Sequence, residues 1–172
     1  LLHPEHLSAY HLIYEEDTVL WKLREQHKVE EADEDLSGSL FRTLIDRLTS
    51  EGYYHYEISN FSLPGLYSRH NSSYWTEKKY LGCGPSAHSY NGVSRQWNVA
   101  SLDTYIKGIS AGTPVFEIEE LDLYTRYNDF VITRIRTEWG LPLSKLRDEF
   151  GEKLYDYCLR MAAPHLKQGT LE

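Results

Sequence analysis

The sequence predicts an α/β fold in which strands and helices alternate up to about residue 112 and helices alone follow. Two observations support this. Apolar and aromatic stretches at 6–14 and 53–61 flank a long helical pattern at 33–49. Beyond residue 102, apolar residues recur mainly at helical spacing. Because strand, helix and strand follow in that order, we expect a βαβ unit and a parallel sheet.

The first strand is expected at residues 6–14, and one or two helical turns at 18–26. The helix expected at 33–49 begins after Asp33, a good N-cap residue, and ends at Gly52. Its apolar side chains recur at intervals of three and four residues, at Leu36, Leu40, Leu44, Ile45 and Leu48.

The second strand is expected at residues 53–61, before the breaker Pro64-Gly65. Ser59 and Asn60 lie near its C-terminal end, which faces the active site in a barrel strand. Two interpretations stay open: these side chains hydrogen-bond a substrate, or they are small polar residues that end a strand.

A polar and aromatic loop is expected at 66–79, a glycine-rich turn within 80–90, and a short strand at 94–99. Helices are expected over four later ranges: 102–111, 119–138, 143–150 and 153–167. We predict a boundary near Gly112-Thr113-Pro114, which divides the chain into residues 1–112 and a helical domain at 113–172.

Composition excludes several function classes. Asp and Glu number 26 against 18 Lys and Arg, and no basic run occurs, so nucleic-acid binding is disfavoured. No apolar stretch approaches the roughly 20 residues that span a bilayer. The two cysteines, Cys83 and Cys158, form no CxxC pair, which suits a reducing cytoplasm. Because the chain opens on Leu1 and its only methionine is Met161, we expect a piece of a longer protein.

The segment from His70 to Trp75 holds an imidazole, an amide and two aromatic rings. An imidazole can coordinate heme iron, and aromatic faces can stack on a porphyrin. Nearby cations could pair with propionates: Arg69, Lys78, Lys79 and Arg95. The alternative is an ordinary loop in which His70 hydrogen-bonds its neighbours and Trp75 anchors the packing.

Small residues fill the segment Gly82–His88, where the backbone can approach a ligand closely. It is not a dinucleotide-binding fingerprint, because Ala87 stands in place of the third glycine and no long helix follows. The alternative is a tight turn between strands.

Four segments in this order and spacing carry a family resemblance: His6–Leu12, Tyr56–Phe61 with Pro64-Gly65, Arg69–Trp75 and Tyr80–Ser89. Together they resemble the oxygen-independent coproporphyrinogen III oxidase family of radical-SAM proteins. The resemblance is strong over about residues 6–100 and looser beyond. It implies the C-terminal part of a partial TIM-type (βα) barrel followed by a helical domain.

The resemblance also implies cofactors and sites. The full-length protein would hold a [4Fe-4S] cluster and S-adenosylmethionine (SAM), although the family's CxxxCxxC motif is absent from this chain. Ile13, Gly84, Ala87 and His88 fall at the SAM site, with His88 in place of an apolar residue. Without cluster ligands, we expect this chain alone to be catalytically inactive.

The HNxxYW pattern at residues 70–75 resembles the heme-chaperone branch of the family rather than the decarboxylating enzymes. This implies heme as cargo, a heme-acceptor protein as partner, His70 as candidate axial ligand to the iron, and heme contacts from Asn71, Tyr74 and Trp75. Ser59, Asn60 and Arg69 are candidates for binding the tetrapyrrole. Two alternatives remain: a true SAM-dependent coproporphyrinogen III decarboxylase, and a non-catalytic module that binds a partner protein.

Overall fold

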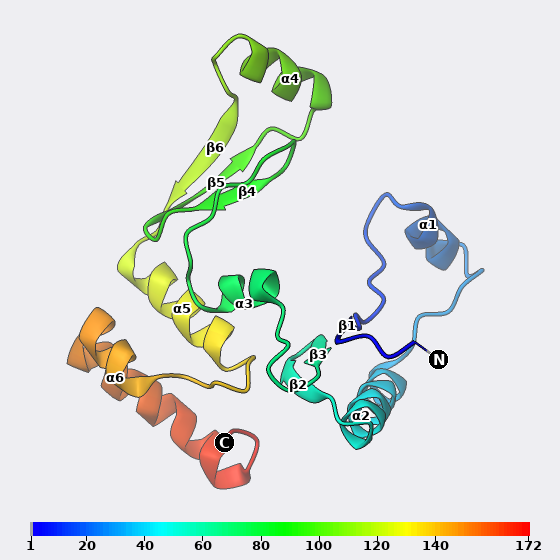
Figure 1. Cartoon of the computed structure of the whole chain (residues 1–172), viewed down its shortest axis with the longest axis vertical. Coiled ribbons are helices and arrows are strands. Elements are labelled where there is room, and N and C mark those ends of the chain that lie inside the picture. The colour runs from blue at the N-terminus through cyan, green and yellow to red at the C-terminus, as the bar shows by residue number, and fades with distance from the viewer. Residues whose placement is uncertain (1) are drawn as a thin grey trace. The chain divides into compact units, whose positions relative to one another are not determined.

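The computed structural model describes residues 2–172, which form two compact units. The first ends at Ser68, and the second is Arg69–Glu172 (Figure 1). The boundary predicted near residue 112 falls within the second unit, between a helix and a strand. The division of the complete protein into residues 1–112 and 113–172 stays a prediction.

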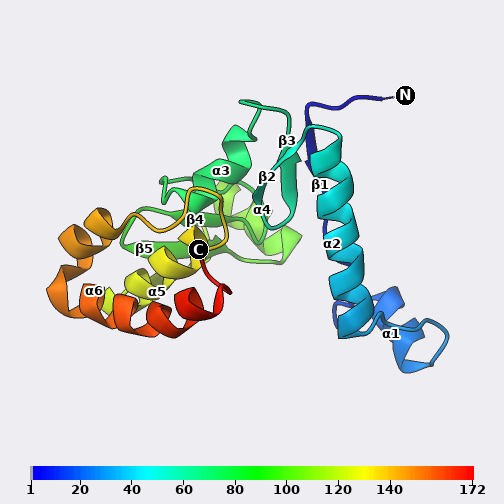
Figure 2. The ribbon, with the colours of Figure 1, turned by 90° about the horizontal axis from the view of Figure 1, so that it is seen from below.

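The first unit combines a small sheet with two helices. Its elements are β1 His6–Ser8, α1 Val19–Glu25, α2 Glu34–Ser50, β2 Tyr54–Glu57 and β3 Asn60–Ser62. The strand order is β1-β3-β2, and β3 is antiparallel to both neighbours. In Figure 2, α2 runs alongside this sheet.

The helix α2 confirms the pattern-based prediction. The carboxylate of Asp33 accepts a hydrogen bond from the backbone N–H of Leu36 at 2.7 Å, as an N-cap does. The chain leaves the helix at Glu51 and turns at Gly52, whose φ of 87° suits glycine.

The predicted parallel pairing is wrong. The stretch 53–61 is not one strand, because a turn at Ile58-Ser59 folds it into the hairpin of β2 and β3. Strand β3 inserts between β1 and β2, so these two run in the same direction without pairing. The first strand is also shorter than predicted and stops at Ser8.

Aromatic packing holds the first unit together. Tyr56 and Phe61 are fully buried. The ring of Phe61 stacks on His55 at 4.5 Å, and that of Tyr56 meets Tyr67 edge-on at 4.9 Å. The hydroxyl of Tyr56 also lies 2.7 Å from Nε2 of His6 and so links β2 to β1.

The second unit contains a longer sheet and most of the helices. Its elements are α3 Arg69–Trp75, β4 His88–Tyr90, β5 Ser94–Asn98, α4 Leu102–Ser110, β6 Phe116–Glu120, α5 Leu123–Arg134 and α6 Leu143–Gln168. The sheet is antiparallel, in the order β4-β5-β6. In Figure 1, α4 lies at one end of this sheet.

The core of the second unit lies between α5 and α6. It consists of Tyr127, Phe130, Leu146, Phe150 and Cys158. Helix α6 kinks at Gly151, where φ is 80° and ψ is 167°, so its two halves match the separate helices predicted at 143–150 and 153–167. The first half contributes Leu146 and Phe150 to the core with α5, and the second half contributes Cys158.

Three predictions for this unit are wrong. Helices alone do not follow residue 112, because strand β6 comes after it and pairs with β5. The loop predicted at 66–79 contains the helix α3. The helix predicted at 119–138 is shorter, because residues up to Glu120 belong to β6 and α5 starts only after its N-cap, Asp122.

Both units mix helices and strands, so the predicted α/β class is confirmed. Within residues 2–172, no helix is both long and apolar enough to cross a membrane.

Candidate functional site

Helix α3 carries the residues predicted to handle heme. His70 and Tyr74 lie one turn apart and are both exposed. Their rings meet edge-on with centroids 5.1 Å apart, and the Tyr74 hydroxyl lies 3.3 Å from Nε2 of His70. An exposed imidazole on a helix is accessible to a metal-bearing ligand, so the geometry permits the predicted iron contact.

Trp75 ends α3 and is largely covered. Its indole N–H is buried and has no hydrogen-bond partner among residues 2–172. The guanidinium of Arg136 lies 5.5 Å from the ring centroid. The hydroxyl of Ser72, on the same helix, is likewise buried and unpaired within the described residues. Unpaired buried polar atoms carry an energetic cost, so two of them on one short helix set it apart from the rest of the fold.

A row of tyrosines continues from α3 into the sheet. Tyr74 meets Tyr80 at 5.1 Å, and Tyr80 lies 6.2 Å from Tyr90, with which it also exchanges two backbone hydrogen bonds of 2.9 Å. Burial raises the pKa of both Tyr80 and Tyr90 above the usual value for tyrosine. These phenols therefore keep their protons to a higher pH than an exposed tyrosine does, and they can donate hydrogen bonds.

The glycine-rich turn is tied together by one side chain. The Asn98 amide donates hydrogen bonds to the carbonyls of Gly82 and Gly84, at 3.3 and 2.9 Å. The Gly84 N–H donates to the hydroxyl of Tyr105 at 3.0 Å. A side chain at residue 82 would overlap the backbone carbonyl of His88, so this glycine is required for close chain packing. The turn alternative therefore has direct support.

The other predicted SAM contacts have different environments. Ala87 is half-buried; its backbone N–H donates to the carbonyl of Gly84 in the turn, and its carbonyl accepts from the N–H of Asn98 on β5. His88 is exposed on β4 and stacks on Trp97 at 5.8 Å. Ile13 is 70% exposed and belongs to the first unit. A SAM site made of these residues stays a prediction.

Asn60, predicted to bind a substrate, is buried inside the first unit. Its carbonyl oxygen accepts from Ser8 at 2.6 Å, and its amide nitrogen donates to the buried carboxylate of Glu57. The carboxylate also accepts from the backbone N–H of Ser59, at 3.3 Å. This network fixes the β2–β3 turn, and a substrate would have to replace one of its bonds to reach Asn60.

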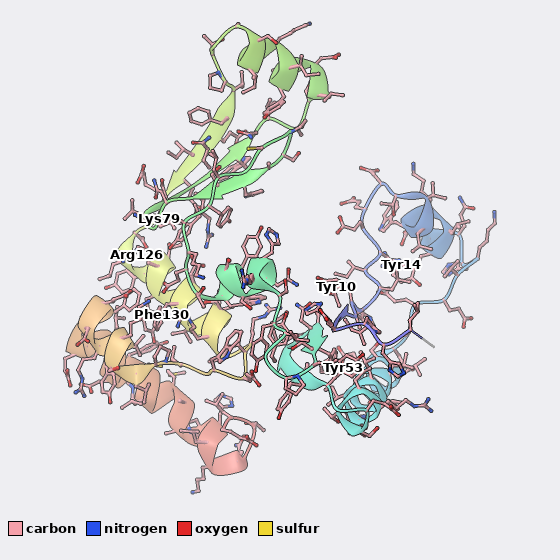
Figure 3. The ribbon with its side chains drawn as sticks, viewed as in Figure 1. Tyr10, Tyr14, Tyr53, Lys79, Arg126 and Phe130 are labelled. Carbon is pink, nitrogen blue, oxygen red and sulfur yellow. The ribbon has the colours of Figure 1, made fainter. Side chains whose placement is uncertain are left out.

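Ser59 itself lines a groove of about 670 Å³ in the first unit. The groove lies between the segment after β1 and one face of α2, with Tyr10 and Tyr14, labelled in Figure 3, on its wall. Arg69 belongs to the second unit, where it is exposed at the start of α3. The described residues thus assign the three substrate candidates to two different units.

An iron–sulfur cluster does not fit the residues described. Cys83 is exposed and Cys158 is buried in the α5–α6 core. No group of three or more His, Cys, Asp or Glu side chains in residues 2–172 is arranged to hold a metal ion.

Sequence reasoning missed the residues of α5 that face α3 and the sheet. Arg126, Asp129 and Thr133 lie on one side of α5 and line a cavity together with Tyr74 and other residues. Their spacing of three and four residues is visible in the sequence. The sequence does not show that this face lies against α3 and the sheet, because that contact depends on tertiary packing.

No family model matches this chain. Curated relatives do match. The chain is 35% identical over 143 residues to the heme chaperone HemW of Mycobacterium tuberculosis, an alignment that covers 83% of this chain and 37% of that protein. It is 29% identical over 154 residues to the heme chaperone HemW of Bacillus subtilis, covering 89% and 41%.

The chain is homologous to the HemW heme chaperones. A more distant relative is the mitochondrial radical S-adenosyl methionine domain-containing protein 1 of Danio rerio, 31% identical over 115 residues, which are 62% of this chain and 26% of that protein. The chain spans about two-fifths of the length of the HemW proteins it matches. The predicted family resemblance is confirmed.

A solved structure shares the fold. Coproporphyrinogen III oxidase (HemN) from Escherichia coli, described as a radical SAM enzyme, superposes with a TM-score of 0.70 at 18% identity. The match covers 97% of this chain and 42% of that structure. At this identity the likeness confirms the HemN-like fold and carries no argument about activity.

Proposed function

We propose that the complete protein is a radical-SAM-family heme chaperone that binds heme through His70 on α3. The observation that carries this proposal is the exposed His70–Tyr74 pair, which offers an accessible imidazole beside a row of aromatic rings. Homology to proteins named heme chaperone HemW supports it. The [4Fe-4S] cluster would be held outside the residues described, and heme would pass to an acceptor protein in the cytoplasm.

Heme titration of the full-length protein, followed by the Soret band, tests this proposal. We expect His70→Ala to lower heme affinity by at least about tenfold, because the iron loses its protein ligand. Since His70 is exposed, the substitution removes a surface contact with Tyr74 and no buried packing, and circular dichroism of the two proteins should coincide.

His165→Ala is the matched control. His165 is also an exposed helical histidine of the second unit, near the end of α6. Its removal should leave the titration unchanged. If wild type and His70→Ala bind heme with equal affinity and the same spectrum, His70 is not the ligand. A full-length wild type without heme binding contradicts the chaperone proposal itself.

One second candidate is a SAM-dependent coproporphyrinogen III decarboxylase, since the first strand and the glycine-rich turn of this chain resemble those of the decarboxylating enzymes. This candidate predicts that the full-length protein, anaerobic and with a reduced cluster, converts two propionates of coproporphyrinogen III to vinyl groups. Product analysis with an intact cluster decides: conversion supports the decarboxylase, and its absence leaves the chaperone.

A further inference from the structure

A small cavity of about 90 Å³ lies beside α3 in the second unit. Its walls come from the end of α3 and the segment after it, from the sheet, and from α5. The lining residues are Tyr74, Glu77, Lys78, Tyr80, Tyr90, Arg95, Arg126, Asp129 and Thr133. Tyr74 belongs both to this cavity and to the contact with His70, so the cavity adjoins the proposed heme site. Its volume suits a few heavy atoms and excludes a whole porphyrin.

The two carboxylates in the cavity wall are already neutralised. Glu77 accepts hydrogen bonds from Arg134 at 3.0 Å and from Lys145 at 2.9 Å, and neither of these cations lines the cavity. Asp129 is paired with Arg95. Neither carboxylate is therefore left to balance the charge of the other cations in the cavity wall.

Two cations in the wall remain without a carboxylate. In the described part of the chain, neither Lys78 nor Arg126 forms an ion pair with an acidic residue. Arg126 is half-buried on α5, where Figure 3 labels it. Burial and then the charge of Glu77 raise the pKa of Tyr90, whereas Arg126 opposes this rise, so the charge of Arg126 lies near that phenol. The cavity thus carries an excess of positive charge.

The wall also offers a free hydrogen-bond donor. The half-buried hydroxyl of Tyr80 makes no hydrogen bond within residues 2–172, and that of Tyr90 makes only a long one of 3.4 Å to Gly92. Phenols and guanidinium groups are donors to anions, and a carboxylate can accept from several of them at once.

We propose that this cavity binds one carboxylate side arm of the tetrapyrrole whose iron His70 holds, with Arg126, Lys78 and the Tyr80 hydroxyl as its partners. The inference rests on the proposed heme binding and deepens it. A propionate is small enough for the cavity and carries the negative charge that would balance its excess positive charge. The contact between Tyr74 and Tyr80 connects the cavity to the proposed heme site at His70. The macrocycle itself stays outside, against the exposed face of α3.

The test compares a ligand whose propionates are charged with one whose propionates are uncharged. The full-length protein is titrated with heme and with heme dimethyl ester, in which both propionates are uncharged. We expect the wild type to bind the ester at least about tenfold more weakly than heme. In Arg126→Gln the ratio of the two affinities should fall by about tenfold, because the charged partner is gone.

Two further variants keep the test interpretable. Lys153→Gln removes one positive charge from an exposed lysine of α6 that does not line the cavity, and should behave as wild type. Arg126→Lys retains the charge and should recover part of the preference for the free acid. A wild type that binds heme and its ester equally, or an Arg126→Gln variant that keeps the full ratio, overturns the proposal.

Failure of heme binding is distinguishable from failure of this site. If the wild type binds no heme, the chaperone proposal falls, and iron-free protoporphyrin and its dimethyl ester then decide the cavity by fluorescence titration, since they need no axial ligand. A preference for the acid that Arg126→Gln abolishes supports the carboxylate site. Equal binding of the two, or no binding of either, overturns it.

Discussion

The hydroxyl oxygen of Tyr74 lies 3.3 Å from Nε2 of His70, one helical turn away on α3, with the two rings perpendicular. A hydroxyl that donates to Nε2 occupies the lone pair that a metal ion would use. In that tautomer, iron and the Tyr74 hydroxyl compete for the same nitrogen. The arrangement keeps the imidazole oriented until a stronger ligand displaces the phenol.

Tyr74→Phe tests this competition. The ring remains and the hydroxyl is lost, so we expect heme affinity to rise about two- to threefold, as removal of one long, exposed hydrogen bond suggests. Soret titration of wild type and variant measures it. Weaker binding in the variant would instead show that the hydroxyl contacts the bound ligand.

The core between α5 and α6 should depend strongly on Phe130. This side chain is fully buried, and Phe130→Ala should lower the free energy of unfolding by about 3–5 kcal/mol. Phe116→Ala is the matched control, because Phe116 on β6 is 43% exposed and leaves a smaller cavity. Urea denaturation measures both, and equal losses would contradict the packing described.

Stability at high pH should depend on Tyr127. Burial, and secondarily the neighbouring Cys158, raises the pKa of Tyr127 from 10.0 to about 12. Between these values the unfolded chain releases a proton that the folded chain retains, so folding stability is intact below pH 10.0 and falls as pH rises towards 12.

Unfolding at a series of alkaline pH values checks this. Tyr127→Phe should flatten the fall relative to wild type, whereas Tyr124→Phe, at an exposed position of the same helix, should leave it unchanged. Parallel curves for wild type and Tyr127→Phe would contradict the assignment.

Two glycine substitutions should act in opposite directions. Gly82→Ala brings a methyl group onto the carbonyl of His88, so we expect a loss of about 1–3 kcal/mol, as at other overpacked sites. Gly38→Ala lies inside α2 and meets only the flexible end of Arg42, so it should stabilise by about 0.5–1 kcal/mol. Thermal unfolding of both variants provides the comparison, and a tolerated Gly82→Ala would contradict the tight turn.

Elements with strong local signals could be predicted from the sequence. Helix α2 combines an N-cap aspartate with regular apolar spacing, and β5 lies within residues 94–99, where a strand was predicted. The interruption of α6 at Gly151 was also visible, since glycine is a poor interior helix residue.

Elements without such signals could not. The hairpin turn at Ile58-Ser59 lacks the Asn-Gly or Asp-Gly pair that marks two-residue turns, so one long strand was predicted. Helix α3 consists largely of residues with weak helix propensity, so a loop was predicted. The alternation of Phe116 and Ile118 with glutamates is typical of a strand, but the last two residues of β6 fall within the helix predicted at 119–138.

The candidate site also combines residues that a local sequence pattern marks with residues that it does not mark. The HNxxYW pattern pointed to His70 and Tyr74, which the structure brings into contact. The proposed carboxylate site depends on α5, whose Arg126 lies far from α3 in the sequence. Its proximity is a product of tertiary packing, which no local pattern encodes.

The kink at Gly151 has a consequence for comparing sequences across species. Its backbone angles lie in a region that is almost reserved for glycine, and a side chain there costs about 1–3 kcal/mol. A homologue with the same bend should therefore keep glycine at this point. One that has replaced it should have either a straight terminal helix or a bend at another residue, so this single position can anchor an alignment where the surrounding sequence has diverged.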